Sequence, residues 1–167
     1  MIARLMFAIV DFAARKGLTD ENPSHGVPES AKLRARRTGI RGETYAYWYL
    51  RRHGYVLVAR NYRSPNMKGE IDMIGYDGKV LAFVEVKTRA MDDDADPAKP
   101  QNRPEDSVNW NKRRNLTRVA RQFLRARRIE SAECRFDVMA IENRAGSPPQ
   151  VRLHKGAFGA NWPGRDT

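Results

Sequence analysis

An Asp-Gly pair at residues 77 and 78 is the feature that most restricts how this chain can fold. It separates two segments in which apolar and polar residues alternate, Gly69–Tyr76 and Val80–Arg89. Such a pair between two alternating segments is the strongest short-range signal for a β-hairpin closed by a two-residue turn. The sequence therefore predicts an antiparallel strand pair in the middle of the chain.

A two-residue turn also fixes which residues of the two strands face each other. Counting back from the Asp-Gly turn, the predicted partners are Tyr76 with Lys79, Asp72 with Phe83, and Glu70 with Glu85. Because side chains alternate with period two, four polar residues share one face of this hairpin, namely Glu70, Asp72, Glu85 and Lys87. Like charges placed opposite each other destabilise a sheet, so three grouped carboxylates need either a cation nearby or a fully hydrated face, and the apolar residues around them argue against simple hydration.

A divalent metal ion is the cation that suits this group. Mg²⁺ binds through one or two carboxylates, keeps several waters and leaves room for phosphate oxygens, and Mn²⁺ is the alternative. Lys87, two residues beyond Glu85 on the same face, would stabilise charge on a phosphate or help to orient an attacking water. Glu-x-Lys alone also describes an ordinary surface ion pair, so the inference depends on adding Asp72 through the hairpin register.

The other segments predict an α/β fold with a mixed five-stranded sheet flanked by helices. The expected elements, in order, are a helix from Thr38, as N-cap, to His53, closed by a left-handed Gly54, a strand Tyr55–Arg63, the hairpin, a helix Pro104–Arg127, and strands Arg135–Glu142 and Val151–Phe158. The first three strands form an antiparallel meander, and the long helix returns the chain for a parallel strand. Residues 1–37 are predicted to be an N-terminal extension, in which Met1–Val10 form either a short amphipathic helix or a start-site extension and a flexible basic linker follows. The domain then covers 38–158, an acidic loop occupies 91–103, and 159–167 form an irregular tail.

Two helical residues extend the predicted site. Glu43 shares a helix face with the inward-facing Ala46 and Leu50, so it is a candidate fourth carboxylate; the alternative is a partly exposed glutamate favoured by the helix dipole. In the second helix, Lys112 lies on one flank of the apolar stripe, one turn before the core begins, where it could reach the end of the sheet and a bound phosphate. Arg113 lies at a similar angle on the other flank. Four arginines are expected on the outward side of this helix, at 114, 118, 121 and 125.

The charge of the chain indicates its partners. The formal net charge is +11 and the pI is about 10.2, which favours a polyanion, and nucleic acid above all. The alternative is a basic surface that only keeps the protein soluble. No apolar run approaches the ~18 residues that span a membrane, so stable membrane insertion is not expected. A single cysteine, Cys134, excludes an intrachain disulfide and is typical of a reducing, cytoplasmic location.

The motifs resemble one known family. Those motifs are Gly39-x-x-Gly42-Glu43-x-x-Ala46, Ala59-Arg-Asn-Tyr-Arg63, Gly69-Glu-Ile-Asp72, Phe83-Val-Glu-Val-Lys-Thr-Arg89, Lys112 and Arg135-Phe-Asp-Val138. Together they resemble the YraN family of bacterial endonuclease-like proteins, which belongs to the PD-(D/E)XK nuclease superfamily and is similar to archaeal Holliday junction resolvases. The similarity covers residues 38 to 143 in motif order. The acidic segment after Arg89 is longer than is usual in the family.

This resemblance implies a restriction-endonuclease-like fold and a Mg²⁺- or Mn²⁺-dependent endonuclease acting on structured or branched DNA. It implies that Asp72 and Glu85 hold the metal, that Lys87 is the catalytic lysine and that Glu43 is the helix carboxylate of the site. Glu70 is a further candidate ligand. The candidate contacts to nucleic acid are Arg63, Arg89, Lys112 and Arg113. Two alternatives stay open, a nuclease-fold protein that binds DNA or RNA without cutting, and an assembly role. Paired cuts on a two-fold substrate would favour a homodimer.

Overall fold

The computed structural model describes residues 2–15, 31–65, 67–91, 108–144 and 147–159. It has three helices and five strands within these ranges. In chain order they are α1 (Ile2–Arg15), α2 (Ala31–Arg52), β1 (Val56–Arg63), β2 (Glu70–Asp77), β3 (Val80–Met91), α3 (Trp110–Ala126), β4 (Cys134–Arg144) and β5 (Gln150–Phe158).

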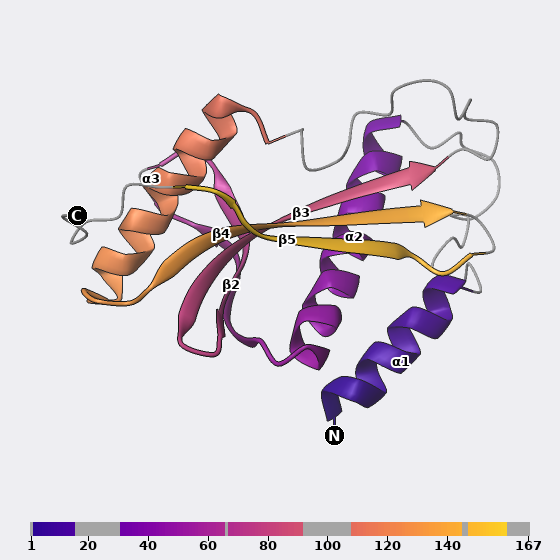
Figure 1. Ribbon diagram of the computed structural model, residues 1–167. Helices are drawn as coiled ribbons and strands as arrows, with labels where there is room; N and C mark the ends of the chain where they lie inside the picture. Colours follow the sequence, from indigo (N-terminus) through magenta and orange to yellow (C-terminus); the bar gives the residue numbers. More distant parts are fainter. Residues whose placement is uncertain (1, 16–30, 66, 92–107, 145–146, 160–167) are drawn as a thin grey trace.

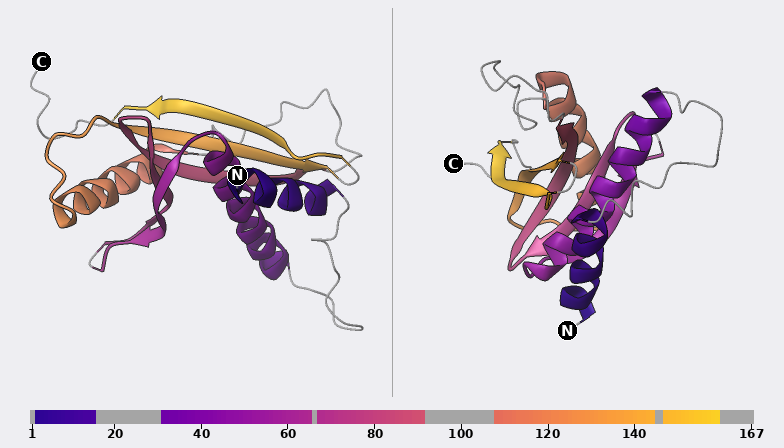
Figure 2. Two further views of the ribbon diagram at one scale, coloured as in Figure 1. Left: turned by 90° about the horizontal axis from the view of Figure 1, so that it is seen from below. Right: turned by 90° about the vertical axis from the view of Figure 1, so that its right-hand side faces the viewer.

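The strands form one mixed sheet in the order β1-β2-β3-β4-β5. Strands β1, β2 and β3 form the antiparallel meander, β3 and β4 run parallel across the α3 connection, and β5 returns antiparallel to β4. Figure 1 shows α3 on one side of this sheet and α2, with α1 beside it, on the other, and the turned views of Figure 2 agree. The predicted α/β architecture, with its meander and its helical crossover to a parallel strand, is confirmed.

Each face of the sheet has its own apolar core. On the α3 side, the apolar stripe of α3 packs on alternate strand residues such as Phe83 and Phe136. On the α2 side, Ala46 and Leu50 pack on Val84 and other strand residues of the opposite parity. Strand side chains alternate between the faces, so β3 contributes apolar residues to both cores. The central strands are therefore buried on both sides, and a carboxylate on one of them extends from a backbone that lies in the interior of the protein.

The hairpin register differs from the predicted one by a slip at the turn. Asp77 pairs with Val80, so Gly78 and Lys79 form the two-residue turn, with Gly78 at φ +62° in its first position. A glycine with positive φ at that position is typical of one of the two favoured hairpin turns. The predicted pairs of Tyr76 with Lys79, Asp72 with Phe83 and Glu70 with Glu85 are therefore wrong. Each partner moves by two residues, and a shift of two by itself preserves the alternation between the two faces.

The first helix of the domain starts earlier than predicted. The expected N-cap, Thr38, lies inside α2, which begins at Ala31, so the basic run from 32 to 37 is part of a helix. Gly54 follows the helix with φ +90°, as expected for a left-handed C-terminal glycine. The second predicted helix begins at Trp110 after the N-cap Asn109, later than expected. The predicted start at Pro104 and most of the acidic loop lie outside the described residues, as do positions 16–30 and 160–167.

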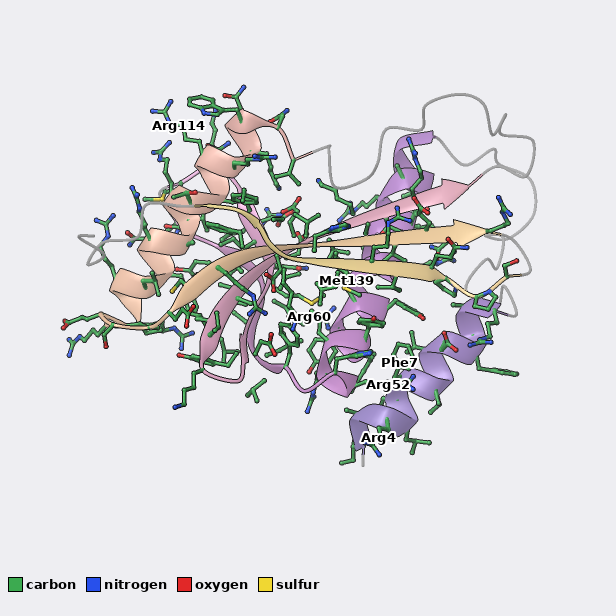
Figure 3. All side chains as sticks on the ribbon, in the orientation of Figure 1. Arg4, Phe7, Arg52, Arg60, Arg114 and Met139 are labelled. Carbon is green, nitrogen blue, oxygen red and sulfur yellow. The ribbon has the colours of Figure 1, made fainter. Side chains whose placement is uncertain are left out.

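Helix α1 packs against α2 and covers part of its outer side. The Phe7 ring is buried 5.3 Å from the Tyr45 ring, and Arg52 lies over it at 4.8 Å (Figure 3). Asp11 accepts a hydrogen bond of 2.8 Å from the Tyr45 hydroxyl. No helix among the described residues has the length and apolar character that a membrane span requires.

Candidate functional site

Strands β2 and β3 bring Asp72 and Glu85 together. The last ladder pair described is Met73 with Val84, and extending this register by one step puts Asp72 opposite Glu85. Beyond that pair, the Asp72 carboxylate accepts the Val86 amide at 2.7 Å. The two side chains are 8% and 3% exposed. The hairpin therefore places two adjacent carboxylates in the interior of the protein. At this point the Val86 amide donates to the Asp72 side chain and not to the backbone of β2.

The Glu85 carboxylate is only half satisfied. Its Oε1 atom lies 2.9 Å from the Lys87 ammonium on the same strand and 3.1 Å from the Lys112 ammonium on α3. Its Oε2 atom is buried and has no hydrogen-bond partner among the described residues. A buried acceptor without a partner costs free energy and calls for an explanation. Both lysines therefore bind Oε1, and Oε2 is left without a hydrogen-bond donor among the described residues.

Asp72 carries the clearest electrostatic sign of an incomplete site. Burial and the neighbouring charge of Glu85 raise the pKa of Asp72 to about 7, and Glu43 adds a further increase. The Val86 amide and the Lys112 ammonium act in the opposite direction, but they are outweighed. At neutral pH the carboxylate pair therefore needs either a proton or a second source of positive charge.

Glu43 approaches the site from the helix on the other face of the sheet. A Cβ atom on Gly42 would lie 1.7 Å from the Thr88 hydroxyl oxygen of β3, so only a glycine lets the α2 backbone come this close. Glu43 is the next residue, half-buried, and its charge raises the pKa of Asp72. The close approach of α2 explains how a residue of this helix acts on an aspartate that faces α3.

The other predicted residues are engaged elsewhere. Glu70 accepts hydrogen bonds from Arg63 of β1, with the shortest ion-pair distance at 2.6 Å. Arg89 lies opposite Glu142 of β4, whose pKa is lowered mainly by hydrogen bonds from Arg152 and further by the charge of Arg89. Arg113 donates to the Val108 carbonyl at 2.8 Å and lies over the Phe158 ring. Of the candidate contacts to nucleic acid, only Lys112 joins the carboxylate pair.

A site with two carboxylates is the kind that binds Mg²⁺ in proteins. Within the described ranges, no three His, Cys, Asp or Glu side chains are grouped closely enough to form a metal cluster by themselves. Mg²⁺ accepts one or two carboxylates and fills its remaining positions with water and phosphate oxygens. The unpartnered Glu85 Oε2 and the raised pKa of Asp72 mark these two residues as the pair that would hold such an ion.

A second polar cluster was not predicted, although its central motif, Arg135-Phe-Asp-Val138, stood out in the sequence. Asp137 is fully buried and accepts hydrogen bonds from the Tyr55 hydroxyl at 3.2 Å, the Gly156 amide at 2.9 Å and Arg135 at 2.9 Å. Arg135 also binds Asp77 at the hairpin turn, and Lys155 donates to Asp77 at 2.7 Å. The spacing of Arg135 and Asp137 signals a shared strand face, but their partners come from three other segments, at Tyr55, at the hairpin turn and on β5.

The fold defines the class of protein. A mixed five-stranded sheet with helices on both faces, with β3 and β4 parallel, is consistent with the restriction-endonuclease-like fold. The model of the uncharacterised protein family UPF0102 matches residues 42–141, from Gly42 beside Thr88 to the end of the β4 core. The chain belongs to this family, which is the YraN family of the PD-(D/E)XK-like superfamily, and the predicted family resemblance is confirmed.

Curated relatives agree over most of their length. A UPF0102 protein of Koribacter versatilis is 41% identical over 132 residues, which is 79% of this chain and 86% of the relative. One from Solibacter usitatus is 39% identical over 131 residues, covering 76% and 92%. One from Symbiobacterium thermophilum is 39% identical over 126 residues, covering 75% and 99%. These names state family membership and no activity.

Proposed function

We propose that the protein is a divalent-metal-dependent endonuclease that hydrolyses phosphodiester bonds in structured or branched DNA, with Mg²⁺ or Mn²⁺ at Asp72 and Glu85. The observation that carries the proposal is the buried Glu85 Oε2 atom, which has no partner among the described residues and lies on a residue adjacent to an aspartate of raised pKa. A site that served only to stabilise the fold would be expected to satisfy both oxygens.

The side chains divide the work of phosphodiester hydrolysis between them. A bound divalent ion supplies an activated water and offsets negative charge on the phosphate. Asp72 and Glu85 would hold that ion, and the Val86 amide fixes the Asp72 carboxylate in place. The Lys87 ammonium, 2.9 Å from Glu85, is positioned to stabilise charge that develops on a phosphate oxygen. Lys112 of α3 adds a second positive charge at the same Glu85 oxygen.

The charge of the protein supports a nucleic-acid substrate. The net charge is +11, and α3, which supplies Lys112, also carries exposed arginines at 114, 118 and 125. Binding that depends on such residues releases counterions from the nucleic acid and weakens steeply with salt. The same surface would serve a nuclease-fold protein that binds DNA or RNA without cutting it, so activity has to be measured directly.

The test measures cleavage and metal binding on the same variants. Junction, flap and duplex DNA are incubated with Mg²⁺ or Mn²⁺ and with wild type, Asp72→Asn, Glu85→Gln or Glu70→Gln. We expect wild type and Glu70→Gln to cut, because Glu70 is paired with Arg63 outside the carboxylate pair. We expect the other two variants to lose cleavage and to lose Mn²⁺ binding by calorimetry.

Two results would argue against this function. If wild type cuts no more than Asp72→Asn on every substrate, the catalytic proposal fails. If wild type also binds DNA with a steep salt dependence that Glu85→Gln leaves unchanged, the non-catalytic binding protein becomes the better description.

A further inference from the structure

Trp110 is a large apolar side chain exposed at the start of α3. It is the first residue of the helix and is 68% exposed, although tryptophan is usually well buried in folded proteins. Its backbone is held firmly on both sides. Val108 is buried two residues earlier, and the Asn109 side chain caps the helix by accepting the Lys112 amide at 3.0 Å. The exposed ring is thus displayed from a fixed backbone.

One side of the indole ring is associated with a positive charge. The Arg114 guanidinium lies 5.4 Å from the ring centroid, one helical turn after Trp110. A guanidinium that stacks on an aromatic face leaves the opposite face of the ring available for a second flat group. Arg118 and Arg125 continue the basic surface along the same helix, while Arg121 is half-buried. Figure 3 shows Arg114 at the first turns of α3, pointing away from the sheet.

Trp110 lies at the end of α3 that carries the site lysine. Lys112 is two residues further on, and its ammonium is 3.1 Å from the Glu85 carboxylate. A separation of two residues in a helix turns the side chains by about 200°, so Trp110 and Lys112 point to opposite sides of a helix about 10 Å across. A few nucleotides of an extended strand cover that distance. A strand whose phosphate lies at Asp72 and Glu85 can therefore cross the end of α3 and reach the indole.

From this arrangement we propose that Trp110 and Arg114 form a stacking platform for an unpaired base of the nucleic acid bound at the Asp72 and Glu85 site. The substrate is then single-stranded beside the reacting phosphate, as in a flap, a gap or an opened junction. Paired bases are stacked inside a duplex and do not offer a free face to an indole, whereas every unpaired base does. This inference rests on the proposed function for the location of the phosphate, but it concerns binding rather than cleavage.

The experiment measures binding without metal, so that it does not depend on catalysis. Labelled oligonucleotides of about 20 nucleotides, single-stranded, single-stranded with abasic residues, and blunt duplex, are titrated in EDTA and followed by anisotropy. The variants are Trp110→Ala, Trp110→Phe and, as a matched control on the same helix, Arg118→Ala. Because Trp110 and Arg118 are exposed, these changes leave the core intact.

We expect Trp110→Ala to weaken binding to the single strand by at least about fivefold, the lower end of what one stacked base contributes, with Trp110→Phe retaining most of the affinity. Duplex affinity should change by less than about twofold. Removing the bases should weaken wild type and leave Trp110→Ala unaffected, because the two changes delete the same contact. Arg118→Ala should weaken single strand and duplex alike and lower the salt slope by about one.

The proposal is overturned if Trp110→Ala binds the single strand as wild type does, if it weakens single strand and duplex equally, or if wild type binds no oligonucleotide. Failure of the nuclease proposal would look different. Wild type would cut nothing with Mg²⁺ or Mn²⁺, while its preference for unpaired bases would still depend on Trp110.

Discussion

Two clusters of carboxylates lie on the same sheet, and they are completed in opposite ways. In the Asp72 cluster, which consists of Asp72 and Glu85 with Lys87 and Lys112, the pKa of Asp72 is raised to about 7 and Glu85 Oε2 has no partner among the described residues. In the Asp137 cluster, which consists of Tyr55, Asp77, Arg135, Asp137 and Lys155, both Asp137 oxygens accept hydrogen bonds. Arg135 and Lys155 lower the pKa of Asp77.

The difference separates structural carboxylates from functional ones. The Asp137 cluster joins β4, β5, the hairpin turn and Tyr55 with donors supplied by the protein itself, so it needs nothing from outside. The Asp72 cluster is buried at a cost to the fold that its own donors do not offset. Buried carboxylates with perturbed pKa values and incomplete partners are typical of functional sites.

The largest effect should come from disrupting the Asp137 cluster. Arg135→Met removes the guanidinium from Asp137, which is fully buried, and leaves its charge with only neutral donors. Loss of one partner of a buried pair is strongly destabilising, so we expect the free energy of unfolding to fall by about 3 kcal/mol. Urea denaturation followed by circular dichroism measures it. A loss below about 1 kcal/mol would mean that the Asp137 cluster does not stabilise the fold.

The next effect should be on activity with little effect on stability. Lys87→Ala removes the ammonium beside Glu85 from a half-exposed position, and we expect Mg²⁺-dependent cleavage to fall by about 10²- to 10³-fold, as for the loss of one charge-stabilising donor. Initial rates on a flap substrate measure it. Lys155→Ala, which removes the lysine that donates to Asp77 in the Asp137 cluster, is the matched control and should leave the cleavage rate within about twofold of wild type.

A smaller effect should follow from moving α2 away from the Asp72 cluster. Gly42→Ala puts a methyl group against the Thr88 hydroxyl, and crowding of this kind costs about 1–3 kcal/mol. We expect lower stability and lower activity together, because Glu43 moves with the helix. Adding Thr88→Ala to Gly42→Ala should recover part of both. If the double variant is no better than Gly42→Ala, the close approach at Thr88 is not what positions the helix.

The smallest effect should be a difference in pH dependence. The pKa of Asp72 is raised in the folded protein, so its favourable contribution is complete below its unfolded pKa near 4 and is lost as pH rises towards 7. Without metal, Asp72→Asn should match wild type in stability near pH 4 and be the more stable protein at pH 8, by a margin that grows as the pH rises between these values. Asp77, with a lowered pKa, acts in the opposite direction and stabilises above its ordinary range. Unfolding of both proteins across this pH range tests the sign, and a variant less stable at pH 8 would contradict it.

Much of the hairpin was accessible from the sequence because its signals are local. Alternation and the Asp-Gly pair predicted two strands and a turn, and they placed Asp72, Glu85 and Lys87 on one face. The turn nevertheless closes one residue later, at Gly78 and Lys79, since Asp77 pairs with Val80 and its carboxylate is held by Arg135 and Lys155. Those partners lie more than 50 residues away, and no local pattern reports them. Glu85 and Lys87 nevertheless share a face, as their ion pair of 2.9 Å shows, because a change in register of two residues preserves the alternation.

The sequence by itself determined the α/β order, the family and the residues that share a face, because each depends on spacing along the chain. Tertiary structure alone decided which carboxylates are left incomplete. Three such outcomes depend on contacts between separate elements. Asp72 is buried, Lys87 and Lys112 both bind one Glu85 oxygen, and Glu70 pairs with Arg63 and not with the other carboxylates. Desolvation and pairing act through space, so a cluster that looks uniform in the sequence becomes one buried pair and one surface ion pair in the fold.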